Sequence, residues 1–120
     1  MSLYYQVSSR TNQDFTSVSS VGWNIIHWIV SRLNADDHCV DYLEIIQGST
    51  SNMSYLINQS SNVGNTSLHE AAYVNNHKAI EWLLHNNANI TVRNNSGQRP
   101  GEHTRCDNET KELLAQCISY

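Results

Sequence analysis

This 120-residue sequence has little proline and glycine, few charges and no long apolar run. One Pro, five Gly and 15% charged residues do not fit a collagen-like or a disordered chain. No apolar stretch approaches the ~20 residues of a membrane-spanning helix. The N-terminus also lacks the basic and then apolar pattern of a signal peptide. We therefore expect no membrane association.

Basic clusters are absent as well. The formal net charge is −4, and the sequence contains no block of Lys or Arg. Surfaces that bind nucleic acids need clustered positive charge to neutralise phosphates. The composition thus predicts no nucleic-acid partner.

The three cysteines, Cys39, Cys106 and Cys117, are odd in number and form no CxxC pair. This usage fits reduced thiols better than a disulfide framework. It predicts a cytoplasmic or nuclear protein. The apolar fraction of 39%, with three Trp and six Tyr, is enough for one packed domain, which we place at residues 1–120.

A 33-residue unit starts at Gly64 and is followed by Gly97 at the same phase. Thr66 is suited to cap a short helix, because its hydroxyl can accept a free N–H of the first turn. The residues spaced along one face of this helix are Leu68, Ala71 and Ala72. Asn75-Asn76 should end it, because Asn tolerates the left-handed conformation.

A second helix is predicted directly after this break. Its apolar stripe consists of Ile80, Leu83 and Leu84. Asn86-Asn87 should end it in the same way, and residues 94–97 read as a tight turn at a loop tip. The unit is therefore a helix–turn–helix followed by a hairpin loop.

This unit resembles an ankyrin repeat. The positions that meet the family pattern are Gly64, Thr66, Leu68, His69, Ala71, Ala72, Leu83, Leu84, Ala88 and Ile90. Ser67 replaces the usual Pro, and Asn75 and Asn87 replace Gly. Asn89 replaces Asp. The resemblance implies an all-α fold, an ankyrin-repeat α-solenoid of stacked helix–turn–helix units.

A second copy lies upstream, at residues 22–63. Residues 22–30 match 64–72 position by position, and a second helix is expected over 36–47, with Val40, Leu43 and either Ile45 or Ile46 inward. Because the two copies start 42 residues apart, the upstream copy carries nine extra residues. We expect about three of these between the helices near Asn34, and about six in a loop over 48–54. This loop is either a disordered bulge or a grafted contact loop.

The copies at 64–96 and 97–120 differ in quality. The last one is degenerate, because Gly101, Glu102 and Arg105 stand where the pattern needs apolar residues, His or Ala. Asp107-Asn108 can still cap a final helix, as expected of a terminal repeat whose outer face meets water. Residues 1–21 are interpreted as a partial repeat or N-terminal extension, with Leu3, Tyr5 and Val7 from its second helix.

Histidine and cysteine chemistry is weakly supported. His27 and His69 occupy the family's His position, where the ring is expected to hydrogen-bond the backbone and stiffen the loop between repeats. For the other histidines, no Cys or carboxylate completes a set of four zinc ligands. His38 and Cys39 are neighbours in a helix, where side chains point about 100° apart, so they form no dyad. We predict no catalytic, cofactor or metal residues, and expect Trp28 and Trp82 in the core.

The resemblance also implies where a partner binds, across the hairpin tips and the concave face of the first helices. The residues at the corresponding positions are Trp23, Arg32, Asn62, Asn65, Tyr73, Arg93, Asn95, Gln98 and Arg99. Trp23, Tyr73, Arg93 and Arg99 carry the most weight, because Trp, Tyr and Arg dominate binding energies at interfaces.

The sequence therefore predicts a monomeric protein-interaction module, an adaptor or scaffold that binds another protein, and not an enzyme. One alternative is a targeting or regulatory tail of a larger multidomain protein, such as an enzyme or an acyl-CoA carrier. A third is a thiol or zinc enzyme. Bound metal or a reactive cysteine would reveal it.

Overall fold

The computed structural model describes residues 18–34 and 37–118, and all regular structure within these ranges is helical. The helices are α2 (Ile25–Arg32), α3 (Cys39–Ser49), α4 (Met53–Asn58), α5 (Ser67–Tyr73), α6 (His77–His85) and α7 (Asn108–Ile118). The predicted helical segment around Leu3, Tyr5 and Val7 lies outside the described residues.

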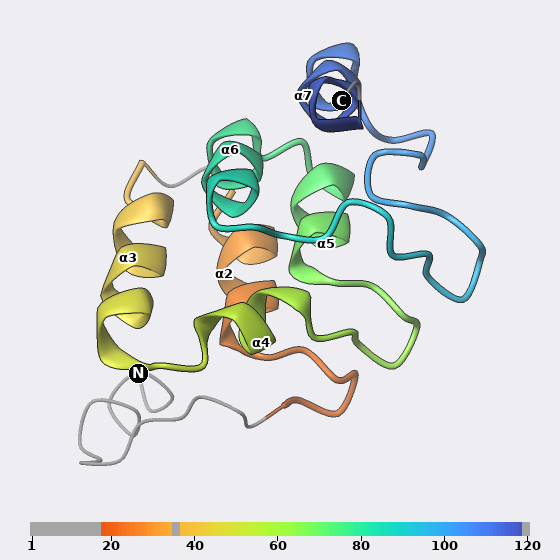
Figure 1. Cartoon of the computed structure of the whole chain (residues 1–120). Coiled ribbons are helices and arrows are strands. Elements are labelled where there is room, and N and C mark those ends of the chain that lie inside the picture. The colour runs from red at the N-terminus through yellow and green to blue at the C-terminus, as the bar shows by residue number, and fades with distance from the viewer. Residues whose placement is uncertain (1–17, 35–36, 119–120) are drawn as a thin grey trace.

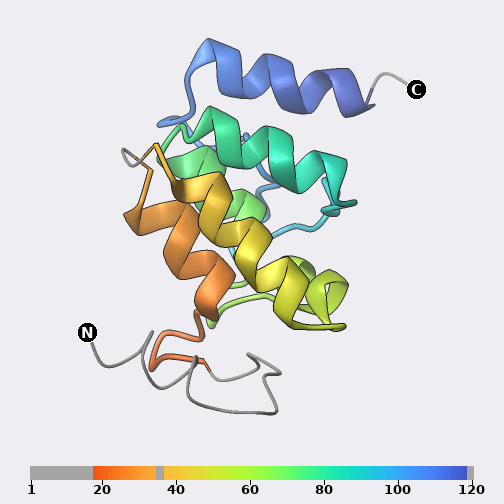
Figure 2. The ribbon, with the colours of Figure 1, turned by 90° about the vertical axis from the view of Figure 1, so that its left-hand side faces the viewer.

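The helices form two layers (Figures 1 and 2). One layer holds the first helices, α2 and α5, whose interface is the most extensive between any two helices described. The other holds α3, α6 and α7, of which α6 packs against both neighbours. Hairpin loops project to one side of both layers (Figure 1). The predicted all-α solenoid is confirmed.

Helices α2 and α5 start with the same capping arrangement. The side chain of Thr66 accepts the N–H of His69, and the ring Nδ1 of His69 accepts the N–H of Thr66 in return. Asn24 and His27 form the same reciprocal cap on α2. Each cap satisfies backbone donors that the first helical turn leaves free. The expected role of Thr66 as a cap is confirmed.

Asparagines end α5 and α6 in the left-handed conformation, as predicted. The φ angles are 57° at Asn75 and 67° at Asn87. Their side chains differ, however. The amide of Asn75 donates to the carbonyl of Arg105 at 3.0 Å, and its Oδ1 accepts the N–H of Asp107 at 2.7 Å. Asn75 therefore also anchors the segment that leads into α7.

The prediction for the extra residues of the upstream copy is correct for the α2–α3 connection and wrong for the segment over 48–54. The α2–α3 connection spans residues 33–38 and the α5–α6 connection only 74–76, so three extra residues do lie there. The predicted loop over 48–54 is wrong. Helix α3 continues to Ser49, and α4 starts at Met53 after a short connection.

Helix α4 forms because its apolar face is buried. Met53, Leu56 and Ile57 all belong to the core, and α4 packs against α5. A helix of six residues is too short to be stable alone, so this burial must hold it in place. The insertion is thus a structural part of the stack.

The core runs through both layers and includes Leu43, Ile46, Leu68, Ile80 and Leu83. Of the two alternatives for α3, Ile46 faces inward and Ile45 is exposed. Trp82 is buried at 8% exposure, as predicted. The same prediction is wrong for Trp28, which is 43% exposed, because it lies on α2 opposite the stripe that faces the core.

The degenerate last copy keeps only its second helix. Residues 98–107 form turns, and α7 follows with the Asp107 carboxylate accepting the N–H of Thr110 at 2.8 Å. Leu114 then closes the core. The predicted final helix and its cap are confirmed.

Candidate protein-binding surface

The hairpin tips are joined in a row by backbone hydrogen bonds. The N–H of Asn62 donates to the carbonyl of Val21 at 3.0 Å, and that of Asn95 donates to the carbonyl of Val63 at 2.9 Å. The two donors are 33 residues apart and the two acceptors 42, because the upstream copy carries nine extra residues, and both bonds join equivalent positions of neighbouring hairpins. Loops tied together this way present their side chains from a rigid support.

The side chains of Asn62 and Asn95 reinforce the same row. The amide of Asn62 donates to the carbonyl of Ser20 at 2.9 Å, and that of Asn95 donates to the carbonyl of Asn62 at 3.2 Å. Both were predicted as partner contacts. Their amides are engaged within the chain, while both residues remain exposed at the tips. A contact with a partner stays a prediction for both.

The two repeat histidines, His27 and His69, fix the hairpins to the helices. In each, Nδ1 accepts a backbone N–H, so the ring proton is on Nε2. Nε2 of His27 donates to the carbonyl of Asn65, and Nε2 of His69 to that of Gln98, both at 2.9 Å. The predicted backbone-bonding role is confirmed.

Burial of these rings disfavours their charged form. It lowers the pKa of both His27 and His69 below the ordinary value of 6.5, and the backbone carbonyls they contact only partly oppose this. Both histidines therefore act as neutral donors at neutral pH.

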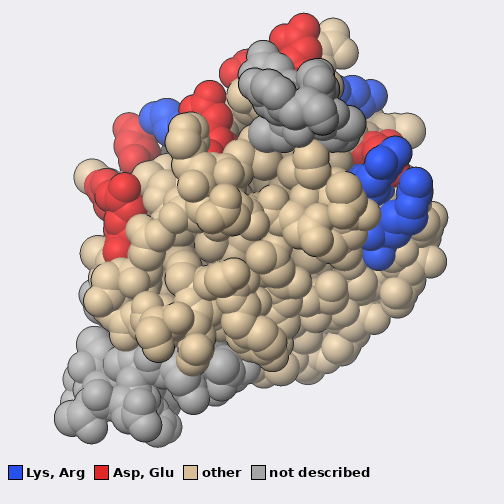
Figure 3. All heavy atoms as spheres, in the orientation of Figure 1, with Lys and Arg blue, Asp and Glu red and all other residues tan. Residues whose placement is uncertain are grey.

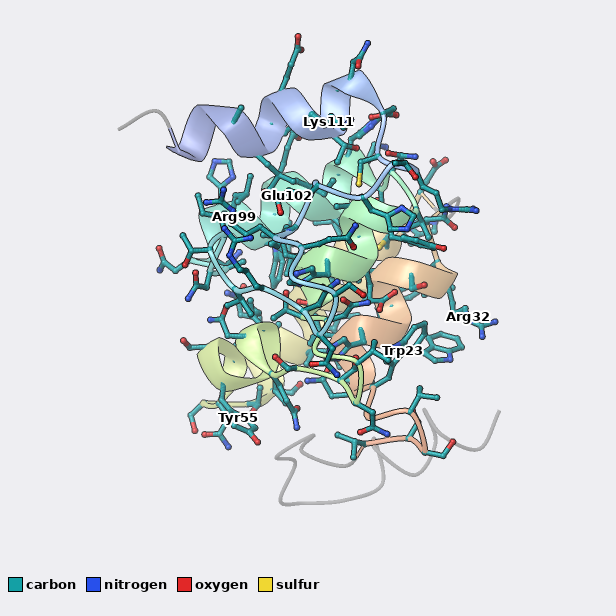
Figure 4. All side chains as sticks on the ribbon, turned by 90° about the vertical axis from the view of Figure 1, so that its right-hand side faces the viewer. Trp23, Arg32, Tyr55, Arg99, Glu102 and Lys111 are labelled. Carbon is teal, nitrogen blue, oxygen red and sulfur yellow. The ribbon has the colours of Figure 1, made fainter. Side chains whose placement is uncertain are left out.

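A groove of about 340 Å³ lies between the hairpin around Val63, the hairpin around Asn95 and the C-terminal end of α5. Its lining includes Val63, Tyr73, Asn94, Gln98, Arg99 and His103. The sequence-predicted residues Asn65, Tyr73, Gln98 and Arg99 thus meet at one hollow. Trp23 and Arg32 lie outside it, on the side of the hairpin around Val21 (Figure 4).

The floor of the groove contains a buried carboxylate, Glu70. Its Oε2 accepts the side-chain amide of Asn65 at 3.0 Å, and the Oδ1 of Asn65 accepts the amide of Asn94 at 2.9 Å. Burial raises the pKa of Glu70, and the bond from Asn65 partly offsets this rise. The predicted contact residue Asn65 is therefore part of a buried polar network.

Trp23 and Arg32 form a pair on the concave side. The guanidinium of Arg32 lies over the indole of Trp23, with its central carbon 5.8 Å from the ring centroid (Figure 4). The indole also stacks on the ring of His27, with 6.4 Å between centroids and an angle of 12°. The two predicted contact residues are therefore held together.

Tyr73, at the end of α5, forms a second pair of this kind. The guanidinium carbon of Arg105 lies 4.8 Å from the centroid of its ring, and His103 packs edge-on at 4.7 Å. Tyr73 remains 38% exposed. The sequence prediction missed Arg105 and His103, because they lie in the degenerate copy, whose residues depart from the repeat pattern.

Arg93 and Arg99 share one carboxylate. Nε of Arg99 lies 3.2 Å and Nη1 of Arg93 4.0 Å from the Glu102 carboxylate, and Arg93 also donates to the carbonyl of Gly97 at 2.7 Å. Hydrogen bonds from the backbone and side chain of Arg99 lower the pKa of Glu102. The charges of these two predicted contacts are thus partly balanced within the chain.

Other kinds of site find no support in the part of the chain that the structure describes. No three His, Cys, Asp or Glu residues lie close enough there to hold a metal ion. The described thiols, Cys39 and Cys106, are both buried, and burial raises the pKa of Cys106. None of the described helices is both long and apolar enough to cross a bilayer.

Stacked helical hairpins with their tips in a row define this molecule as an α-solenoid repeat protein. A family model described as ankyrin repeats, in three copies, matches residues 3–94. The chain belongs to the ankyrin repeat family. Ankyrin repeats are in general protein–protein interaction modules.

The chain is also similar to a much longer protein. It is 39% identical over 83 residues to the transcription factor MBP1 of Kluyveromyces lactis. The match covers 64% of this chain and 11% of MBP1, so the chain spans about a tenth of the length of that relative.

Proposed function

We propose that this chain is a protein-interaction module that binds a protein partner across its hairpin tips and the face of α2 and α5, acts as a monomer and catalyses no reaction. The observation that carries the proposal is the groove beside Tyr73, which a row of hydrogen-bonded hairpins borders. Partner-binding residues gather on loops held by a rigid scaffold, because loop side chains contribute little to the fold.

Two aromatic side chains should dominate the binding energy. Trp23 is half-buried and Tyr73 is 38% exposed, and neighbouring rings and guanidinium groups hold both in place. Aromatic side chains that are already ordered lose little entropy on binding. Gln98 and Arg99 border the same groove and complete its polar rim.

An affinity capture from the lysate of the source cell tests this proposal. Wild type is compared with Trp23→Ala/Tyr73→Ala, and captured proteins are identified by mass spectrometry. The matched control is Trp28→Ala/Tyr55→Ala, which also removes one Trp and one Tyr. These two are 43% and 56% exposed and do not line the groove.

Proteins lost with the first double variant and retained with the control would support the proposal. If all three forms capture the same proteins, partners bind elsewhere and the assignment of this surface fails. Circular dichroism of each variant shows whether the fold is kept.

A second function is favoured by the similarity to MBP1. We propose that the module works inside a larger regulatory protein and contributes to the control of transcription, which places it in the nucleus. Fluorescent tagging of the full-length protein tests this. Nuclear enrichment supports the proposal, and exclusion from the nucleus would refute it.

A further inference from the structure

Two arginines of the concave side have no carboxylate partner among the described residues. Arg32 and Arg105 are exposed, and each contacts an aromatic ring through its guanidinium group. Neither guanidinium makes a hydrogen bond or an ion pair within the described part of the chain. Their N–H groups are therefore available to a ligand.

The remaining described arginines differ in this respect. Arg93 and Arg99 both lie beside Glu102, which partly neutralises them. A partner that approached Arg93 or Arg99 would compete with this internal carboxylate. Arg32 and Arg105 impose no such cost.

An aromatic ring attracts a guanidinium held over it and restricts its position. The N–H groups of the guanidinium form a fork that fits a carboxylate. Because a side chain held over a ring has lost part of its freedom already, less entropy is lost when the fork binds. The rings of Trp23 and Tyr73 thus lower the entropy that Arg32 and Arg105 lose when they bind an anion.

The two pairs lie on the same face of the stack. Arg32 is the last residue of α2, and Tyr73 is the last residue of α5. These helices run side by side in the same direction, so their C-terminal ends are neighbours (Figures 1 and 2). One extended segment laid along this face would meet both pairs.

The distribution of charge favours the same partner. Acidic side chains gather along the edge formed by α3 and α6, and basic ones lie near the 90–105 loop on the opposite side (Figure 3). The acid in the floor of the concave groove is the buried Glu70. An acidic partner would be repelled from the first edge and attracted to the second, which fixes its orientation.

We propose that the Arg32–Trp23 and Arg105–Tyr73 pairs bind carboxylates of an acidic protein segment, rich in Asp and Glu, that lies along the concave face. This inference rests on the proposed function and names the chemistry of the partner. In each pair, the N–H groups of the arginine donate hydrogen bonds to one carboxylate of the segment. The aromatic ring contacts the neighbouring backbone of the segment.

The test uses NMR titration of the isotope-labelled full chain with a short peptide of alternating Glu and Ser. The same peptide with Gln in place of Glu is the control ligand. We expect shifts of the Arg32 and Arg105 Nε–H and Trp23 indole signals with the Glu peptide alone. Equal shifts with both peptides, or Glu-specific shifts confined to Arg93 and Arg99, would overturn the proposal.

Three variants separate specific recognition from general attraction. Arg32→Gln and Arg105→Gln should each weaken binding of the Glu peptide about tenfold, as expected for a lost charge-assisted hydrogen bond. Lys78→Gln removes the same charge from an exposed site on α6 and should leave the affinity nearly unchanged. Equal weakening by all three would show a nonspecific charge effect and overturn the proposal.

The captured partner distinguishes failure of this inference from failure of the proposed function. If capture depends on Trp23 and Tyr73 but not on Arg32 and Arg105, the surface is correct and the acidic chemistry is wrong. If capture depends on none of them, the proposed function itself fails.

Discussion

Asn24 is the residue whose replacement tests most directly how the inserted helix is held. It caps α2 with backbone angles (φ −90°, ψ −175°) close to those of Thr66, the cap of α5 (φ −85°, ψ 175°). Unlike Thr, its side chain also has an amide that donates to the carbonyl of Leu56 at 2.9 Å and to Oε1 of Gln59 at 2.7 Å. Asn24→Thr should therefore keep the cap and lose the link to α4.

The structure gives the size of the effect. The carbonyl of Leu56 is buried, and an acceptor left without its partner there costs about 1–3 kcal/mol. Gln59 is only half-buried and can turn to water at little cost. We expect Asn24→Thr to lower the free energy of unfolding by about 2 kcal/mol. Asn24→Ala also loses the cap and should cost about 3 kcal/mol.

Urea unfolding followed by tryptophan fluorescence and circular dichroism measures these values. With a slope of about 2 kcal/mol per molar urea, Asn24→Thr should move the midpoint down by about 1 M. The matched control is Thr66→Ala, which removes a cap and should cost about 1 kcal/mol. That cost should equal the difference between the two Asn24 variants.

Hydrogen exchange adds a local measurement. Amides of α4 should lose protection in Asn24→Thr, while those of α6 should keep it relative to the global stability. A midpoint for Asn24→Thr within error of wild type would refute the reasoning, because the amide would then contribute nothing to holding α4.

Other predictions concern the left-handed positions and the repeat histidines. Asn75→Gly should lower the free energy of unfolding by about 1–3 kcal/mol in urea titrations, because it loses the bonds to the α7 segment. Asn87→Gly, at a similar φ, should change it by about 0.5 kcal/mol or less, and equal effects would contradict this role. Gly64→Ala should cost more than Gly97→Ala in the same assay. Both have φ near 80°, but a Cβ at Gly64 would approach Asn95 to 2.8 Å and one at Gly97 would meet nothing within 4 Å. Stability should also fall as the pH drops below 6.5, because the unfolded chain then binds more protons than the buried repeat histidines do, and this loss should be absent above that pH. A flat stability profile between about pH 7.5 and about pH 5.5 would contradict the lowered pKa values.

That several of the candidate residues lie together was predictable, because their location depends on position within a repeat. Tyr73, Gln98 and Arg99 do meet at one groove, and Trp23 lies against Arg32. Their pairing with Arg105 and Glu102 was not predictable. These partners lie in the degenerate copy, where the repeat pattern no longer gives positions, so only the folded chain shows what they contact.

The sequence by itself determined the features that depend on nearby residues. These features are helix caps such as Thr66, left-handed helix ends such as Asn75, and the apolar spacing of α5 and α6. Because each depends on residues close together in the chain, it can be predicted from their order. The stacking of repeats then follows, since each apolar face needs a neighbour.

Only the tertiary structure decided what the inserted residues and the exposed aromatics do. The segment over 48–54 reads as a loop from its Gly, Ser, Thr and Asn, yet it joins two helices, because Met53 and Leu56 are buried and Asn24 bonds the end of α4. Trp28 is apolar but faces away from the core. Such outcomes depend on contacts between residues far apart in the chain, and a local sequence pattern does not predict these contacts.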